Sequence, residues 1–270
     1  MTKNKIAAQK LSQATTQLLL SEPFFGALAM RLELIEDESV ETECTNGKWI
    51  RYNPKFIESL TVEQIKSEII HEVQHCAKLH PWRRDSRDNE IFNQACDYVI
   101  NNELQSAHYK MDDTWLIDPK FVGMSEEQVY TVLQQEKQKQ QGQRGCLQGS
   151  RKSNMHGQVE DAQDTLTESK AEQQQNWTQA VLQVAQQVKQ YGKLPGFIQV
   201  MVDEIKNPVV DWKSVLRKFI QQSAKSDYSW ARPNKRFVGL GVYLPSMKSE
   251  KLPPICVYDD TSRSRWSKEQ

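Results

Sequence analysis

Five consecutive residues, His71-Glu72-Val73-Gln74-His75, constrain this chain more than any other stretch. On a helix, residues i and i+4 lie one above the other on the same face, so both imidazoles can bind one metal ion. Glu72 directly follows His71, and its carboxylate can reach a water molecule on that ion. Two histidine ligands, a carboxylate base and an acidified water are the parts of zinc-dependent hydrolases. Zinc is the expected ion, because imidazole nitrogens bind it well and a catalytic site keeps one coordination position open.

The residues around the motif predict a helix over residues 61–79. Thr61 and Gln64 have the spacing of a capping box, and Pro81 follows the predicted end. Apolar residues recur at every fourth position and give the helix one core-facing side. They are Ile65, Ile69, Val73 and Ala77. The two histidines lie off this side, where we expect a cleft.

A catalytic zinc site needs a third protein ligand, and Asp97 is the first choice. It lies on a second predicted helix, residues 89–105, which can fold back on the motif helix through the short turn at 81–88. This helix has a wide apolar face and a polar stripe at i, i+4 and i+8 along its edge. The stripe consists of Asn93, Asp97 and Asn101.

Two other residues remain candidates for the third ligand. Glu103 is the main rival, because it projects near the middle of the apolar face. His80 is a weaker rival, since it follows His75 one position too early for the metzincin pattern, and we interpret it as a residue behind the ligands or at the helix end. Nearby arginines could hold a substrate carboxylate or an oxyanion, but we interpret them as a solvated turn. They are Arg83, Arg84 and Arg87.

The residues before the motif predict a helix and a small antiparallel sheet. The helix should cover residues 4–20, and a strand is expected over residues 27–35. Strands over residues 40–44 and 48–52 should form a hairpin around an Asn-Gly pair. An edge strand beside a metal-binding helix can hold an extended peptide by strand addition. The predicted fold class is α+β, with the antiparallel sheet packed on the motif helix and on the helix that follows.

Composition indicates where the chain works and how it is divided. Lys plus Arg number 35 and Asp plus Glu number 35, so no net charge favours nucleic acid or an anionic membrane. The five cysteines lack CxxC spacing, which is typical of a reducing cytoplasm. The N-terminal residues predict an amphipathic helix and not a signal peptide, and no apolar run approaches membrane-spanning length. Residues 134–175 are rich in Gln, Ser, Gly, Lys and Glu and predict a disordered linker.

Several stretches carry a resemblance to a known family: HEVQHCAKLHPWRR, NQACDYVINNEL and LIDPKFVGMSEEQVYTVL. With VDWKSVLRKFIQQSAKSDYSW, RPNKRF and LGVYLPS, they resemble bacterial and phage proteins described as metallopeptidases. Those proteins have a zincin-like N-terminal domain and a von Willebrand factor A-like C-terminal domain. The resemblance covers most of residues 1–255. It implies zinc at His71 and His75, with Glu72 as the base and Asp97 as the third ligand.

The end of the chain departs from that family. Residues 255–258 resemble the first strand of the A-like domain, and Asp260, Ser262 and Ser264 fit its D-x-S-x-S motif. Arg263 stands where the family has glycine. A doubly wound domain needs roughly another hundred residues. The sequence therefore predicts a truncated A-like strand over residues 251–270, without a magnesium site.

The sequence as a whole predicts a zincin-like domain over residues 1–133, the linker, and a helical segment over residues 176–250. We expect zinc-dependent hydrolysis of peptide bonds in a protein or peptide substrate, with Glu72 as the general base. The alternative is a non-catalytic metal-binding adaptor, whose helical segment binds a protein partner. Neither nucleic acid nor a membrane is an expected partner.

Overall fold

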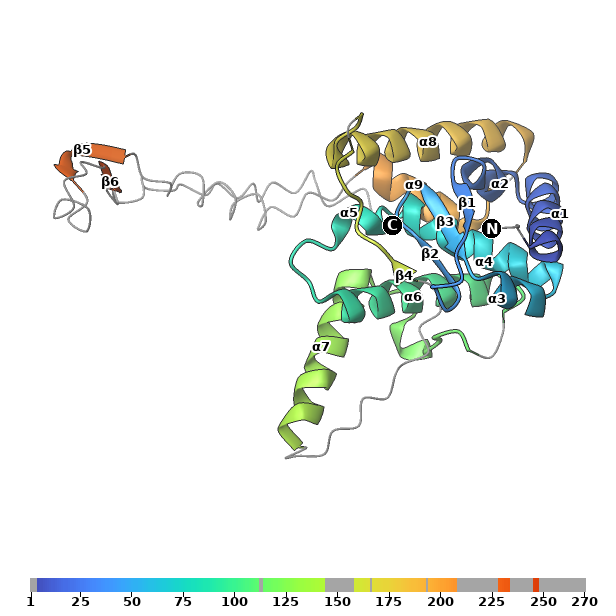
Figure 1. Cartoon of the computed structure of the whole chain (residues 1–270), viewed down its shortest axis with the longest axis horizontal. Coiled ribbons are helices and arrows are strands. Elements are labelled where there is room, and N and C mark those ends of the chain that lie inside the picture. Colours follow the sequence, from blue (N-terminus) through green and yellow to red (C-terminus); the bar gives the residue numbers. More distant parts are fainter. Residues whose placement is uncertain are drawn as a thin grey trace, which may run out of the picture. The chain divides into compact units, whose positions relative to one another are not determined.

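The computed structural model describes residues 4–111, 114–143, 158–165, 167–192, 194–207, 228–233 and 245–247. This part is mainly helical, with one small mixed sheet beside the motif helix (Figure 1). The helices are α1 (Lys5–Ser21), α2 (Pro23–Ala29), α3 (Pro54–Ser59), α4 (Val62–Ala77), α5 (His80–Arg83), α6 (Asn89–Ser106), α7 (Glu126–Gln143), α8 (Lys170–Tyr191) and α9 (Gly196–Lys206), and a 3-10 turn covers Pro119–Phe121. The strands of the sheet are β1 (Glu33–Glu36), β2 (Glu43–Thr45), β3 (Trp49–Tyr52) and β4 (Gln158–Val159). Two more strands, β5 (Tyr228–Pro233) and β6 (Pro245–Met247), pair antiparallel in a separate unit, Pro208–Gln270.

The sheet is mixed, so the prediction of an antiparallel sheet is wrong. β2 and β3 form the predicted antiparallel hairpin, but β1 pairs in parallel with β3, in the order β1-β3-β2-β4. The loop after β1 passes around the end of β3 and is fixed there at both ends. Asp37 N donates to Tyr52 O at 2.9 Å, and Asn53 N donates to Thr42 O at 2.8 Å. β1 is thereby placed on the outer side of β3, where it runs in the same direction as that strand.

The strand predicted over residues 27–35 begins too early, because residues 27–29 belong to α2 and residues 30–32 form a turn. Pro23 stands in the first turn of α2, where its fixed φ and missing N–H suit a helix start. The apolar residues that follow give this short helix a buried side, and the strand begins only at Glu33. The buried residues are Phe24, Phe25, Gly26, Leu28 and Ala29.

The tip of the β2–β3 hairpin is held between two tryptophans. Gly47 has a φ of +89°, which glycine adopts without the strain a side chain would add. A Cβ at this position would lie 2.3 Å from the ring of Trp82. On its other side, Trp177 Nε1 donates to Gly47 O at 2.7 Å. These contacts fix α5 and α8 to the sheet.

One hydrophobic core joins helices from both halves of the chain. It includes Leu11 and Leu18 of α1, Ile65 and Ile69 of α4, Trp177 and Val181 of α8, and Ile198 and Val202 of α9. Residues 1–207 accordingly form one compact unit. The predicted domain boundaries, at residues 133 and 176, both fall inside this unit.

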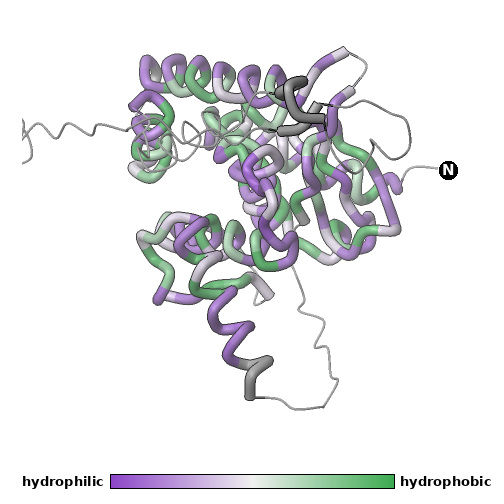
Figure 2. The backbone as a smooth tube through the Cα atoms, turned by 90° about the vertical axis from the view of Figure 1, so that its left-hand side faces the viewer, coloured by the Kyte–Doolittle hydropathy of each residue, from purple (hydrophilic) through white to green (hydrophobic). Residues whose placement is uncertain are grey.

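The predicted linker contains regular structure at both ends. α7 continues to Gln143, β4 joins the sheet at residues 158–159, and α8 begins at Lys170. The middle of the linker, residues 144–157, lies outside the described residues, as does the predicted A-like strand at 251–270. α7 packs against α6 through Val129 and Tyr130 and is hydrophilic along much of its length (Figure 2). Within the described residues, no helix has the length and apolar character needed to cross a membrane.

Candidate metal centre

α4 carries the motif through the interior of the unit. It begins with the predicted capping box: Gln64 N donates to Thr61 Oγ1 at 3.3 Å, and Thr61 N donates to Gln64 Oε1 at 3.0 Å. The side chains of the motif are deeply buried, and His71, Glu72 and His75 are each at most 1 % exposed. The cleft that the sequence predicts beside the histidines is therefore closed in this structure.

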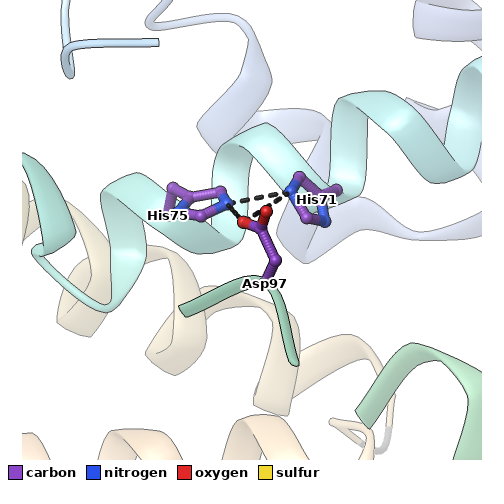
Figure 3. Close-up of side chains that lie close together, drawn as sticks. All are labelled: His71, His75 and Asp97. Carbon is purple, nitrogen blue, oxygen red and sulfur yellow. Dashed lines mark hydrogen bonds and ion pairs between the residues drawn. The ribbon is translucent and has the colours of Figure 1, made fainter. Parts of the chain in front are cut away.

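His71, His75 and Asp97 meet at one point between α4 and α6 (Figure 3). The two Nε2 atoms lie 2.9 Å apart. Asp97 Oδ1 is 3.7 Å from His71 Nε2 and 3.3 Å from His75 Nε2. α4 brings the histidines together by their spacing of four residues, and α6 presents Asp97 from the opposite side.

The three ligand atoms fit a zinc ion. Ligand atoms about 2.0–2.1 Å from a tetrahedral zinc lie roughly 3.3 Å from one another, close to the separations observed. The two oxygens of Asp97 are buried, and neither accepts a hydrogen bond from another described residue. A buried carboxylate in this state is costly unless a cation lies beside it. Burial, followed by the charges of His71 and His80, holds the pKa of His75 well below its usual range, so His75 is neutral, as a ligand must be.

The second ring nitrogen of His71 is fixed by α6. His71 Nδ1 and Asn101 Oδ1 are 3.0 Å apart, and Asn101 Nδ2 in turn donates to Leu116 O at 3.1 Å. If Nδ1 donates to the Asn101 oxygen, the lone pair of Nε2 points at the metal position. Trp115 covers the outer side, with its ring 5.1 Å from the His71 ring and its Nε1 donating to Glu68 Oε1 at 3.2 Å. The stretch that follows α6 thus seals the centre on the His71 side.

The second ring nitrogen of His75 is fixed by another histidine. His80 Nδ1 lies 3.0 Å from His75 Nδ1, and His80 Nε2 lies 3.3 Å from Glu126 Oε1. A chain of donors follows if His75 binds metal through Nε2: its Nδ1–H donates to His80, and His80 Nε2–H donates to Glu126. Leu79 makes this possible, because its φ of +63° turns the chain sharply after α4 and returns His80 toward His75.

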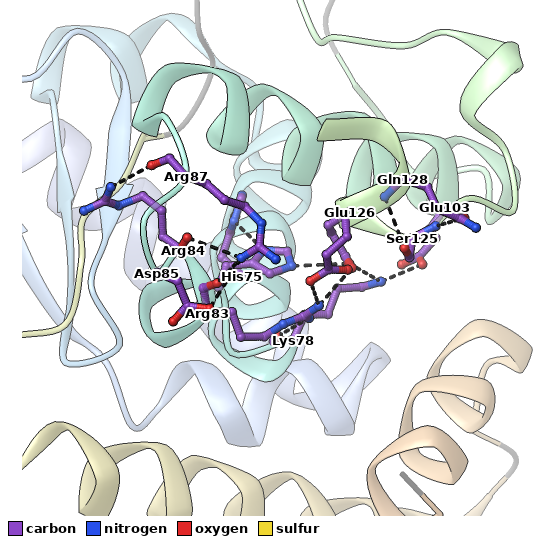
Figure 4. A network of polar contacts seen from close by, with 12 residues as sticks. His75, Lys78, Arg83, Arg84, Asp85, Arg87, Glu103, Ser125, Glu126 and Gln128 are labelled. Carbon is purple, nitrogen blue, oxygen red and sulfur yellow. Dashed lines mark hydrogen bonds and ion pairs between the residues drawn. The ribbon is translucent and has the colours of Figure 1, made fainter. Parts of the chain in front are cut away.

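Glu126 is the charged end of this chain (Figure 4). It contacts Lys78 Nζ at 3.5 Å and Arg83 Nη2 at 3.5 Å. Burial by itself would raise the pKa of Glu126, but the contacts with His80, Lys78 and Arg83 outweigh burial and lower it. Glu126 is therefore an anion at neutral pH. No local sequence pattern indicates this role, because Glu126 lies 46 positions from His80 along the chain.

A second buried carboxylate, Glu43, faces the motif from the sheet. Thr45 Oγ1 lies 3.4 Å from Cys76 Sγ, and Glu43 is on the same face of β2 as Thr45. Glu72 precedes Cys76 by one helical turn, so Glu43 and Glu72 face each other. Neither carboxylate accepts a hydrogen bond from the described residues. Burial and then the charge of Glu43 raise the pKa of Glu72, and burial raises the pKa of Glu43 to about 8.

No motif in the sequence marks Glu43 as part of the site. The hairpin register and the two-residue alternation along β2 are the sequence features that could have indicated its position. Both place Glu43 and Thr45 on one face. That this face meets α4 follows only from the tertiary structure.

The rival ligands lie away from the convergence point. Glu103 accepts a hydrogen bond from Lys78 Nζ at 2.7 Å, and its side chain is 28 % exposed. His80 lies behind His75, as interpreted from the sequence. The arginines are not a solvated turn: Arg83 binds Glu126 and Glu127, Arg84 binds Asp161, and Arg87 donates to backbone carbonyls.

Comparison with known proteins agrees with these observations. The family described as "Putative metallopeptidase domain" matches residues 7–248. An uncharacterized protein of Thermotoga maritima is 24 % identical over 293 aligned residues, which cover 97 % of this chain and 70 % of that protein. No solved structure gives a significant match. Since the family match runs from α1 through both histidines and Asp97 to β6, the chain belongs to the putative metallopeptidase domain family.

Proposed function

We propose that the protein is a zinc-dependent metallopeptidase that hydrolyses peptide bonds. The observation that carries the proposal is the convergence of the two Nε2 atoms and an Asp97 oxygen, with Glu72 on the same helix. Two imidazoles and one carboxylate are a ligand set of catalytic zinc, whereas magnesium prefers oxygen ligands alone. Membership of a metallopeptidase family supports hydrolysis as the reaction.

Each residue has a defined part in this reaction. When bound, zinc supplies a Lewis acid that polarises a peptide carbonyl and lets water lose a proton near neutral pH. His71, His75 and Asp97 hold the ion. A carboxylate oxygen of Glu72 accepts the proton of the attacking water and later delivers it to the nitrogen of the leaving amine. Glu72 accepts no hydrogen bond from the described residues. A zinc ion held beside it would oppose the burial that raises its pKa, and its carboxylate would then be ionised and available for this transfer.

The burial of the centre favours a second candidate, a non-catalytic adaptor with a structural zinc. Structural zinc sites are closed, whereas catalytic sites keep a position for water and substrate. His75 and Glu72 are 0 % exposed, so a peptide reaches them only after a covering segment moves. In the adaptor, Glu72 would have no role in turnover, and this difference separates the two candidates.

The first prediction concerns the ligands and the base together. Wild-type protein should bind about one zinc per chain, and Asp97→Ala should weaken binding by more than about 100-fold, because one of three ligands is lost. Glu103→Ala is the matched control on the same helix and should bind zinc like the wild type. Zinc content of the dialysed proteins and competition with a chelating dye measure both effects.

Hydrolysis is then measured with the zinc-loaded proteins on a mixture of fluorogenic peptides. Glu72→Gln should retain zinc and lose at least about 100-fold of the hydrolysis rate, because general-base catalysis contributes about that much. Equal rates for Glu72→Gln and wild type, or no hydrolysis by either, would exclude the peptidase and favour the adaptor. Zinc loss in Glu103→Ala but not in Asp97→Ala would overturn the ligand assignment.

A further inference from the structure

Residues 158–162, here named the edge segment, lie in extended form along the outer side of β2. Gln158 is opposite Cys44 and Val159 is opposite Thr45, in parallel register. Glu160 N donates to Thr45 O at 2.9 Å, and this bond continues the ladder past β4. The segment is more than 100 positions distant in sequence from the strand that it joins.

Side chains and backbone dock the edge segment in two further places. Val159 is 5 % exposed and Ala162 is 1 % exposed, so the apolar side chains of the edge segment are buried in the unit. Ala162 N donates to Pro81 O at 2.9 Å, which fixes the far end on α5. Backbone hydrogen bonds to a strand edge with small pockets for alternate side chains are the general mode of extended-peptide recognition.

Two arginines form ion pairs with the acidic residues of the edge segment. Arg84 forms a two-pronged contact with Asp161, in which Nε donates to Oδ1 at 2.7 Å and Nη2 donates to Oδ2. Arg84 is itself positioned by its Nη1, which donates to Arg87 O at 2.9 Å. Arg51 of β3 lies 3.6 Å from Glu160. Fork-like arginine–carboxylate contacts combine charge with geometry, so this edge selects for an acidic strand.

The edge segment also lies next to the metal centre. Asn93 Nδ2 is 3.5 Å from Val159 O, and Asn93 precedes Asp97 by one turn of α6. On the other side, Thr45 contacts Cys76, the neighbour of His75. Figure 1 shows β4 passing between β2 and α6, the helix that carries Asp97. A strand bound here therefore contacts a residue one turn from Asp97, and it pairs with the strand that packs against the helix of His71 and His75.

We propose that the edge of β2, together with Arg51 and Arg84, is a binding site for extended acidic peptides, and that the edge segment occupies it in cis. The pairing with β2 is short, with two residues of β4 and one ladder hydrogen bond beyond them. The other contacts of the segment are one hydrogen bond to Pro81 and two partly exposed ion pairs, so a competing peptide that makes the same contacts can replace it. This inference rests on the proposed function only in identifying such peptides as substrates. Binding itself requires neither zinc nor hydrolysis.

The test uses a labelled peptide that copies residues 158–165, Gln-Val-Glu-Asp-Ala-Gln-Asp-Thr. Wild-type protein should bind it poorly, because a tethered segment competes at an effective concentration of the order of millimolar. Asp161→Lys removes the contact that holds the edge segment and leaves Arg84 free for the peptide. Fluorescence anisotropy should show at least about fivefold tighter binding to this variant, the effect of one ion pair of this kind.

Reversing the charge at position 84 tests whether Arg84 recognises the acidic peptide. Arg84→Glu should not bind the acidic peptide more tightly than the wild type does, and it should prefer a peptide with Lys in place of Asp161. Glu38→Lys is the control, because Glu38 pairs with Lys55 at an exposed position and the exchange should leave binding unchanged. The double variant Asp161→Lys/Arg84→Glu restores an ion pair and should again exclude the acidic peptide. This recovery distinguishes a change in binding from misfolding, because a second substitution would not restore a misfolded protein.

Equal peptide binding by wild type and Asp161→Lys, or equal preference of Arg84→Glu for both peptides, would overturn the inference. Failure of the proposed function would look different. In that case zinc-loaded wild type would cleave no peptide, while Asp161→Lys would still bind the acidic peptide more tightly. Conversely, hydrolysis that the acidic peptide does not inhibit in Asp161→Lys would support the peptidase and reject the identification of acidic peptides as its substrates.

Discussion

At the scale of single residues, the centre is defined by buried carboxylates that lack hydrogen bonds. Glu43, Glu72 and Asp97 are at most 2 % exposed, and none accepts a hydrogen bond from the described residues. Leaving such a group unpaired costs on the order of 1–3 kcal/mol, and more when it is charged. A cation beside Asp97 offsets part of this cost. Glu43 has no such partner, and its ionisation should therefore limit the stability of the protein.

This leads to a prediction for Glu43 in the zinc-free protein. Burial raises its pKa from 4.5 to about 8, so between these values the folded state binds a proton that the unfolded state has released. The contribution of Glu43 to stability is thus present at acid pH and is lost as the pH rises toward 8. Glu43→Gln removes this loss, and its advantage over wild type should grow between pH 5 and pH 8 by on the order of 2–4 kcal/mol.

Urea unfolding of both proteins at pH 5 and pH 8 measures the difference. Glu38→Gln, at an exposed ion pair, is the control and should follow the wild type at both pH values. An identical pH dependence for Glu43→Gln and wild type would mean that Glu43 is not buried as a carboxylic acid.

At the scale of elements, the turn between α4 and α5 gives the centre its second layer of contacts. Leu79 adopts a left-handed conformation that costs a residue with a side chain about 1–2 kcal/mol. This strain is maintained by the packing around it and places His80 against His75. His80 is buried, and burial is the first cause that lowers its pKa, so it is neutral and can accept a hydrogen bond at Nδ1. We interpret His80 as a residue that orients His75.

The corresponding prediction concerns zinc affinity. His80→Ala leaves His75 Nδ1 without an acceptor and should weaken zinc binding about 10–100-fold, the usual effect of losing a contact behind a ligand. His80→Gln should recover part of the affinity, since its amide can accept from His75 and donate to Glu126. His108→Asn is the control at an exposed histidine. Competition with a chelating dye at pH 7.5 measures all four proteins, and unchanged affinity in His80→Ala would show that His75 needs no such orientation.

At the scale of the whole molecule, the unit that contains the centre extends to residue 207. α8 and α9 share the core of α1, α2 and α4, and Trp177 binds the hairpin tip directly. Removing α8 would expose an apolar surface that the N-terminal half cannot cover by itself. The A-like resemblance concerns residues outside the described part, so the role of residues 251–270 stays a prediction.

The prediction at this scale compares two fragments. Residues 1–207 should fold cooperatively and bind about one zinc, because they contain the whole core. Residues 1–133, the domain predicted from the sequence, should be unfolded or aggregated and should not bind zinc tightly, because Trp177, Val181 and Ile198 are missing from that core. Circular dichroism on heating and zinc content compare the two. A stable, zinc-binding 1–133 fragment would support the predicted domain boundary instead.

Local geometry explains which features the sequence determined by itself. The spacing of His71 and His75 sets them on one helical face whatever the rest of the chain does. The capping box at Thr61 and the hairpin at Gly47 likewise depend on a few neighbouring residues, and both are present in the structure. The polar stripe on α6 also made Asp97 a candidate, and the structure places it beside the two histidines.

Other features depend on contacts between distant parts of the chain. The parallel pairing of β1, the edge segment on β2 and the packing of α8 on the core each join segments that no local pattern relates. The same holds for Glu43 opposite Glu72 and for Glu126 behind His80. Periodicity shows which face of an element is buried, but not which partner buries it. The ligands could therefore be proposed from the sequence, whereas only the tertiary structure decided how they are held and what covers them.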